Sequence, residues 1–300
     1  MEDQKFLYFS ACYTKLLTGD TYMTESFVLL MLLGFGIGTL GTLIGAGGGF
    51  ILVPILILFY PDLSPESITA ISMAVVAANA SVGSMAYMRT KRIDYKAGII
   101  FAIATIPGSI LGVLTTKHIP KHQFDNIFGF VLIILSIFLF LKGGKEKKSN
   151  PEKKVTGRIH QKITDKYGET YEYIYNMKYG IALSIFVGFF SPLLGIGGGI
   201  IHVPAMVEWL QFPVHIATAT SHFILAIMST VSVIVHYFEG SYNDPKILKM
   251  VAALILGVIP GAFLGAYFSR KVKGKFIIKA LAISLALVGI RILIASLHLL

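Results

Sequence analysis

The chain has 300 residues, of which 55% are hydrophobic and only 14% are charged, and its formal net charge is +10 at pH 7. A soluble domain carries about 25% charged residues, so this composition excludes an ordinary soluble protein and indicates one that lies in the lipid bilayer. Several apolar runs exceed the roughly 18 residues that mark a membrane-spanning helix, which excludes an outer-membrane barrel built from short alternating strands. The single cysteine, Cys12, excludes an internal disulfide and a Cys-x-x-Cys metal or redox site. We expect the basic residues to orient the protein in the membrane and predict no nucleic-acid partner.

The first 24 residues are mixed in character and are expected to form a short interfacial helix or a loosely ordered tail. No cleaved signal peptide is expected, because no long apolar core is followed by a small-residue cleavage site. Residues 25–141 form the first predicted membrane repeat. It opens with an apolar segment, 26–60, that is longer than one span needs and is broken by glycines and by Pro54. Three further spans are predicted at about 65–89, 97–116 and 124–141.

A polar, basic insert at 142–177 separates the two halves of the chain. Alternation of Tyr171, Tyr173 and Tyr175, with an Asp/Gly turn at 165–168, indicates a β-hairpin. A solvated linker is the alternative that the sequence leaves open.

Residues 178–300 form the second predicted repeat and follow the order of the first. A broken apolar segment at 179–210 precedes spans at about 213–237, 249–269 and 276–296. Two motifs recur in the same order about 150 residues apart: Gly-x-Gly-Gly-Gly-x-x-x-Val-Pro at 45–54 and 195–204, and Ile-Pro-Gly-x-x-x-Gly at 106–112 and 259–265. Their recurrence indicates an internal duplication.

Two topologies fit this pattern. If each segment crosses the membrane once, there are eight spans, and the N-terminus, the 89–96 loop and the insert share the cytoplasmic side; the basic 270–275 loop would then face outward. If each glycine break turns the chain back, every half has five membrane elements and the repeats are inverted.

The glycine motifs are the candidate binding site. Each glycine in a helix costs roughly 0.5–1 kcal/mol relative to alanine, so a triplet inside an apolar segment indicates a broken helix. Irregular backbone in a membrane survives where protein or a watery cavity satisfies it, and a pair of such breaks points to a transporter's substrate site. Helix N-termini at the breaks would bind an anion. Close helix packing is the simpler alternative. The predicted backbone ligands are Gly47, Gly48, Gly49, Gly197, Gly198 and Gly199.

Polar side chains of the second span in each half are further candidates. Ser72 and Ser221 occupy matching places, so they are predicted to face the cavity together with Thr220 and His222. Interhelical hydrogen bonding is the alternative for any single one of these residues, and for Asn79. His202 and His236 are candidates for proton coupling, because an ionisable residue in lipid is a functional hypothesis by default. The histidines lack metal-ligand spacing, and no carboxylate pair or nucleophile–base pair indicates catalysis. We therefore predict neither a metal, nor a cofactor, nor an enzyme.

These motifs resemble those of the sulfite exporter TauE/SafE family of membrane transporters. The resemblance rests on the two glycine–proline motifs, the two Ile-Pro-Gly-x-x-x-Gly elements, the insert between halves, and the run from Ala217 to Ser221 with the Phe-Ile-Leu that follows His222. It implies a multi-pass carrier of the cytoplasmic membrane that moves small anions, with sulfite, sulfonates and related organosulfur anions as attributed substrates. The first half departs from the pattern, since Met73 stands where the second half has His222.

The sequence thus predicts an all-α polytopic membrane protein of two homologous repeats, with about four spans each, in contact with the lipid bilayer and a small anionic substrate and capable of forming a homo-oligomer. The predicted function is secondary transport by alternating access around the two breaks. An anion channel, a membrane-anchored interaction module and an intramembrane enzyme are the alternatives.

Overall fold

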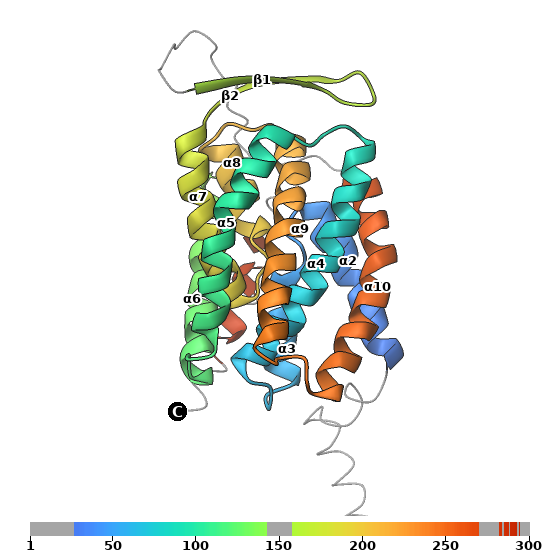
Figure 1. Ribbon diagram of the computed structural model, residues 1–300, viewed down its shortest axis with the longest axis vertical. Helices are drawn as coiled ribbons and strands as arrows, with labels where there is room; N and C mark the ends of the chain where they lie inside the picture. Colours follow the sequence, from blue (N-terminus) through green and yellow to red (C-terminus); the bar gives the residue numbers. More distant parts are fainter. Residues whose placement is uncertain are drawn as a thin grey trace, which may run out of the picture.

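The computed structural model describes residues 27–142 and 158–269, together with 282, 283, 285–287, 289–292 and 294. The predicted N-terminal segment, the first part of the insert and most of the last predicted span lie outside the described residues. Figure 1 shows the helices standing side by side with a β-hairpin lying across one end. We call this the hairpin end, and the opposite end, with the loops at 60–64 and 239–244, the distal end.

Five helices make up the first half: α2 (Phe27–Ile44), α3 (Gly49–Phe59), α4 (Pro65–Arg89), α5 (Tyr95–Thr116) and α6 (Lys121–Lys142). Local sequence sets their starts. The Ser64 hydroxyl accepts a hydrogen bond from the Ser67 N–H, and Pro65 fills the first position of α4, where no N–H is needed. The Asp94 carboxylate caps α5 in the same way, by accepting from the Ala97 N–H.

The second half contains α7 (Met177–Leu194), α8 (Gly199–Glu208), α9 (Val214–Phe238) and α10 (Pro245–Ser269). Further helical residues between 282 and 294 pack against α6, where the Ser136 hydroxyl donates to the Ala282 carbonyl at 2.8 Å. Among the described residues, six helices are long and apolar enough to cross a membrane, namely α2, α4, α5, α7, α9 and α10, and α3 and α8 are shorter apolar helices. The prediction of a multi-pass helical membrane protein is confirmed, whereas the count of eight spans stays a prediction.

The chain reverses direction at both glycine breaks. Helix α2 runs parallel to α10, because Gly257, Gly261 and Gly265 of α10 meet successive turns of α2 at Met31, Phe35 and Thr39. Since α10 climbs from the distal end to the hairpin end, α2 does too, and α3 returns to the distal loop at 60–64 (Figure 1). In the second half, α7 leaves the hairpin directly and α8 comes back to it. The start of α2 therefore lies opposite the 89–96 loop, and the topology that put both on one side is wrong.

The Ile-Pro-Gly-x-x-x-Gly elements hold the two halves together. A Cβ at Gly261 or Gly265 would meet the carbonyl groups of Phe35 and Thr39 in α2. In the same way, a Cβ at Gly108 or Gly112 would meet the backbone of α7 around Phe189. Small residues let membrane helices approach to backbone contact. Each half thus packs its third long helix against the first helix of the other half.

The insert contains an antiparallel hairpin of β1 (Arg158–Thr164) and β2 (Thr170–Asn176), with Ile159 opposite Tyr175 and Thr164 opposite Thr170. Its inner face packs on the membrane helices through aromatic rings. Tyr173 and Tyr175 are buried, and their ring centroids lie 4.6 Å and 4.8 Å from that of Phe212, between α8 and α9.

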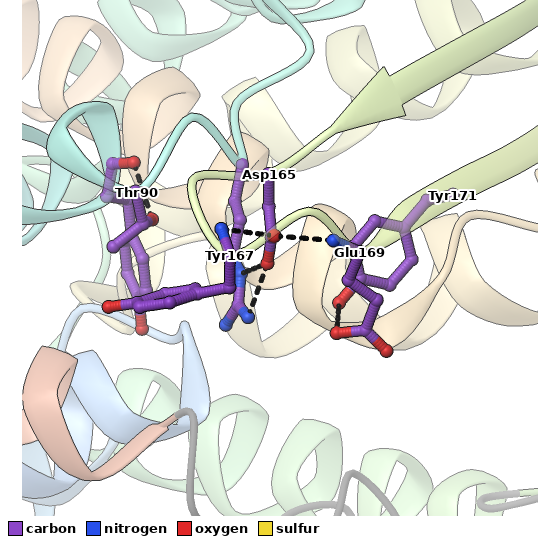
Figure 2. A network of polar contacts seen from close by, with 7 residues as sticks. Thr90, Asp165, Tyr167, Glu169 and Tyr171 are labelled. Atoms are coloured by element: carbon purple, nitrogen blue, oxygen red, sulfur yellow. Dashed lines mark hydrogen bonds and ion pairs between the residues drawn. The ribbon is translucent and has the colours of Figure 1, made fainter.

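Polar contacts fasten the turn of the hairpin to the α4–α5 loop, as Figure 2 shows. Arg92 donates to the Asp165 carboxylate through Nε at 3.0 Å and Nη2 at 2.8 Å, and both side chains are buried. The N–H groups of Tyr167 and Glu169 donate to the other Asp165 oxygen. Burial raises the pKa of Asp165, but the hydrogen bonds from Arg92 and from these N–H groups outweigh burial and leave the pKa below its usual value. The carboxylate is therefore charged at neutral pH and holds the turn in place.

A second contact reaches from the hairpin into the membrane helices. The Tyr173 hydroxyl donates to Asp94 at 2.7 Å, and the Asp94 N–H donates to the Thr220 hydroxyl in α9 at 3.0 Å. Burial raises the pKa of Tyr173, and the Asp94 carboxylate raises it further, so the phenol stays protonated and keeps donating. The hairpin is thus linked to the helix that carries the predicted site residues.

The close packing of α2 on α10 predicts that alanine substitution changes stability differently at two glycines of α2. In Gly38→Ala the new Cβ would lie 2.6 Å from the Val258 carbonyl oxygen, whereas Gly36 has nothing within 4 Å. We expect Gly38→Ala to lower stability by about 1–3 kcal/mol through overpacking, and Gly36→Ala to be neutral or slightly stabilising. Thermal unfolding of both variants in detergent measures this, and equal unfolding midpoints would contradict the packing.

The buried ion pair predicts that Asp165→Ala releases the hairpin turn, because it leaves the Arg92 charge buried without its partner. Breaking a buried pair costs about 3–5 kcal/mol, so exchange of the hairpin amides with deuterium should accelerate strongly. Glu172→Ala is the control on the same hairpin, since its ion pair with Lys162 is exposed, and it should leave exchange unchanged. Similar exchange in both variants would show that Asp165 does not fasten the hairpin.

Candidate functional site: the paired glycine breaks

The two glycine breaks lie against each other in the centre of the protein, and all their residues are buried. A Cβ added at Gly49 would meet the Gly195 carbonyl oxygen, and one added at Gly199 would meet the Gly45 carbonyl oxygen. The start of each short helix therefore touches the end of the long helix from the other half. Only glycine permits this backbone contact in both directions.

The backbone conformation also requires glycine at most of these positions. Gly45, Gly47 and Gly48 have φ angles of 85°, 78° and 88°, and Gly195 and Gly197 have 69° and 68°. These values lie in the left-handed region, which residues with a Cβ rarely adopt. Gly198 differs, because its φ of −40° suits any residue. Here the limit is space, since a Cβ would lie 2.6 Å from a methyl group of Val187.

Several carbonyl groups near the end of each long helix accept hydrogen bonds. At the end of α2, the Gly41 oxygen accepts from the N–H groups of Gly45, Ala46 and Gly47. The Thr42 oxygen accepts from the Gly45 N–H at 3.2 Å and from the Tyr87 hydroxyl at 2.9 Å. At the end of α7, the Ser191 and Pro192 oxygens accept from the N–H groups of Ile196 and Gly195. These acceptors are no longer available to a ligand.

Two serines donate to the carbonyl group of the glycine that follows each long helix, each across the boundary between the halves. The Ser72 hydroxyl of α4 donates to the Gly195 carbonyl at 2.5 Å, and the Ser221 hydroxyl of α9 donates to the Gly45 carbonyl at a longer 3.4 Å. The structure therefore brings both predicted serines to the breaks. Each serine hydroxyl donates its proton to a backbone carbonyl of the opposite break, so that proton is not available to a substrate.

The N–H groups at the start of each short helix have no such partner. Within the described residues, those of Gly48, Gly49 and Phe50, and those of Gly197, Gly198 and Gly199, form no backbone hydrogen bond. The first N–H groups of any helix lack an intrahelical acceptor and lie at the positive end of its dipole. Helices α2, α3 and α9 carry no acidic or basic residue apart from histidine. The breaks thus present several donors without a backbone partner in a buried, uncharged setting, which favours an anion.

The remaining predicted residues lie in different places. Thr220 accepts from the Asp94 N–H and so belongs to the contact with the hairpin end. His222 follows Ser221 and lies beside the α2–α3 break, with its ring edge-on to Tyr87 at 5.5 Å. The carbonyl groups of Thr218 and Gly45 are near its ring, but neither ring nitrogen completes a hydrogen bond within the described residues.

The two histidines predicted for proton coupling are held by separate serines. His202 of α8 shares a hydrogen bond of 3.2 Å with Ser184 of α7. His236 lies in the last turn of α9, at the distal end, and contacts Ser241 at 3.1 Å, whose hydroxyl donates to Glu66. The described residues contain no group of three His, Cys, Asp or Glu side chains placed to hold a metal ion.

Asn79 of α4 joins the α2–α3 break, although the sequence assigned it no more than a contact between helices. Its Oδ1 accepts from the Thr42 hydroxyl at 2.8 Å, while its buried Nδ2 has no partner among the described residues. The signal available in the sequence was its spacing, since it lies two helical turns after Ser72 and so on the same face of α4.

The crossed serine contacts predict that Ser72→Ala and Ser221→Ala each weaken the breaks. Each substitution leaves a buried carbonyl without its donor, which costs about 1–3 kcal/mol. The matched control is Ser109→Ala, because this buried hydroxyl donates only within its own helix, to Ile106. Unfolding midpoints in detergent should fall for the first two variants and stay near the parent value for the third. A larger loss in Ser109→Ala would contradict the role given to the crossed contacts.

Comparison with known proteins identifies the family of this chain. The model of a family described as Sulfite exporter TauE/SafE matches residues 30–292. The chain is 36% identical over 274 residues to the probable membrane transporter protein YunE of Bacillus subtilis, which covers 89% of this chain and 97% of that protein. It is 27% identical over 276 residues to the probable membrane transporter protein MJ0441 of Methanocaldococcus jannaschii, covering 89% and 95%. No solved structure matches. With a family model matched over most of its length and a relative of this identity, the chain belongs to the sulfite exporter TauE/SafE family of membrane transporters.

Proposed function

We propose that this protein is a secondary transporter of small anions that binds its substrate at the paired glycine breaks. The observation that carries the proposal is the set of donors at the breaks: the first N–H groups of α3 and α8 form no backbone hydrogen bond within the described residues, while the carbonyl groups of Gly45 and Gly195 accept from serines. A cation would need the opposite arrangement, with carbonyl oxygens available as ligands. A neutral donor set also suits transport, because it binds an anion without trapping it in an ion pair.

The family description names sulfite, and we take sulfite, sulfonates and related organosulfur anions as the proposed substrates. Such anions carry several oxygen acceptors on one sulfur atom. They can accept from several N–H groups at once, as phosphate and sulfate do at other helix N-termini. Membership in a transporter family is consistent with a protein that is not an enzyme.

The contacts between the halves support two inverted repeats. Equivalent residues make equivalent contacts in both directions: Ser72 meets the second break as Ser221 meets the first, and Gly261 meets Phe35 as Gly108 meets the matching turn of α7. The two halves also run in opposite directions, since α2 rises from the distal end while α7 descends from the hairpin end. Inverted repeats around a central broken-helix site are typical of transporters that work by alternating access.

The two ends of the protein differ in a way that fits one state of such a cycle. At the distal end, an open groove of about 600 Å³ lies between α4, α9 and α10 and is lined in part by Ala74, Ala77 and Ser81. The matching position of Ala74 in the second half is Phe223, by the spacing that relates Ser72 to Ser221. Its ring packs on Gly98 and lies edge-on to Tyr95 at 5.7 Å, which fills the corresponding place at the hairpin end. We infer a state that is open toward the distal end and closed toward the hairpin.

Basic residues indicate which end faces the cytoplasm. The 89–96 loop carries Lys91, Arg92 and Lys96 and belongs to the hairpin end, where Arg92 pairs with Asp165 of the hairpin. We therefore propose that the hairpin end is cytoplasmic and that the protein lies in the cytoplasmic membrane.

Flux into liposomes tests the proposal. We expect the purified protein to move radiolabelled sulfite in a saturable way, with competition by thiosulfate or a small sulfonate and none by sodium or potassium. Gly198→Leu should reduce this flux about tenfold or more, because its side chain would meet Val187 and push apart the two breaks that pack against each other. Gly36→Ala, whose new methyl group meets nothing, is the control and should retain parental flux.

Flux that rises linearly with sulfite concentration would indicate a channel and overturn the carrier mechanism. Selective flux of a cation or neutral solute, without anion flux, would overturn the proposed substrate class.

A further inference from the structure

Asn79 occupies a buried position whose polar neighbours fix one side of its amide. Its side chain is fully buried, and Oδ1 accepts from the Thr42 hydroxyl. The Thr42 carbonyl in turn accepts from the Tyr87 hydroxyl, which connects α2 and α4 a second time. This leaves Nδ2, with its two N–H bonds, as the group that has no partner among the described residues. An unsatisfied buried donor costs about 1–3 kcal/mol, so its presence in a packed interior requires an explanation.

The free nitrogen and the start of α3 pack against the same glycine. A Cβ at Gly41 would lie 2.8 Å from Nδ2 of Asn79 and 2.6 Å from the amide nitrogen of Gly48. Both donors therefore lie on the same side of Gly41, close to each other, and only glycine fits against them. Gly48 is also one of the residues whose N–H forms no backbone hydrogen bond.

The second break lacks this arrangement. By the spacing that relates Ser72 to Ser221, the partner position of Asn79 is Met228. By the spacing that relates Gly45 to Gly195 in the glycine motifs, the partner position of Gly41 is Ser191. The Met228 methyl group lies 3.4 Å from where a Cβ at Gly198 would be, as does the Ser191 Cβ. A thioether donates no hydrogen bond, and a serine side chain stands where the first break has a glycine. The breaks are alike in backbone but different in side-chain donors.

We propose that Asn79 is a specificity-determining ligand, which donates from Nδ2 to one oxygen of the anion while the Gly48 N–H donates to another. This inference rests on the proposed function and deepens it: the α2–α3 break holds the anion, one per chain, and the site favours an oxyanion with at least two acceptor oxygens over a spherical halide. His222, whose ring lies beside Tyr87 and against Gly83, forms the wall of this site from α9.

The competing explanation is that Asn79 has a purely structural role. The hydrogen-bonding chemistry of its amide distinguishes this role from that of an anion ligand. If the amide were turned around, Nδ2 would donate to the Thr42 hydroxyl and Oδ1 would accept from the Gly48 N–H, which would cap α3 without any ligand. Aspartate is nearly the same size as asparagine but can only accept when ionised. Asn79→Asp would therefore preserve a cap and destroy a donor to an anion.

The experiment measures sulfite binding by isothermal titration calorimetry on the purified full-length protein in detergent, with chloride as the competing halide. We expect Asn79→Asp to weaken sulfite binding at least about tenfold, because a charge-assisted hydrogen bond is replaced by repulsion between like charges. Met228→Leu is the matched control at the partner position, and it should bind sulfite as the parent does. Asn79→Leu removes the donor without adding charge. It should also weaken sulfite binding about tenfold while changing chloride binding little. This variant tests the inference even if the aspartate variant fails to fold.

Unchanged sulfite affinity in a folded Asn79→Asp or Asn79→Leu protein would overturn the inference and leave the proposed function standing. So would equal losses in Asn79→Leu and Met228→Leu, since both breaks would then hold the anion alike. If the parent protein binds neither sulfite, thiosulfate nor a sulfonate, the proposed function itself fails, and the inference fails with it.

Discussion

A peptide group buried in a membrane must find a hydrogen-bond partner, and the rest of this structure depends on how two broken helices meet that requirement. Each break leaves carbonyl groups at the end of one helix and N–H groups at the start of the next. The carbonyl groups are satisfied locally by the following N–H groups and remotely by Ser72 and Ser221, which reach across to the opposite half. Since neither break is complete without a serine from the other half, the two halves fold around one shared centre. The first N–H groups of α3 and α8 have no backbone partner among the described residues, and such donors are what an anion requires.

Much of the fold follows from the sequence because its signals are local. Hydrophobic length places the long helices: the spans predicted at about 65–89 and 97–116 are α4 (Pro65–Arg89) and α5 (Tyr95–Thr116). The glycine triplets indicate breaks because left-handed backbone and close contact both exclude a Cβ. The tyrosine alternation and the Asp/Gly turn indicate the hairpin that the structure contains. In each case the interactions that form the element involve residues close together in the sequence, so a local pattern predicts it.

The remainder is tertiary and has no local signal. Nothing in the order of the chain says that α2 lies along α10, or that Gly261 meets Phe35, because these contacts join segments far apart in the sequence. Thr220 and Ser221 are adjacent hydroxyl residues in the sequence. Thr220 nevertheless faces the Asp94 N–H and the hairpin, because successive residues of a helix point in different directions. Arg92 and Asp165 reveal their pairing only once the hairpin lies on the α4–α5 loop. Asn79 becomes a candidate ligand only when its unsatisfied nitrogen is seen beside Gly48.

The most direct test of the central claim is the position of a bound anion. Selenite has the shape and charge of sulfite and scatters anomalously, so a diffraction experiment on crystals grown with it would locate the anion without ambiguity. The account predicts one anomalous peak per chain at the paired breaks, within hydrogen-bonding distance of the first N–H groups of α3 and of Asn79 Nδ2. A peak confined to the distal groove, to the basic loops or to the histidines, with the breaks closed and empty at saturating selenite, would contradict it.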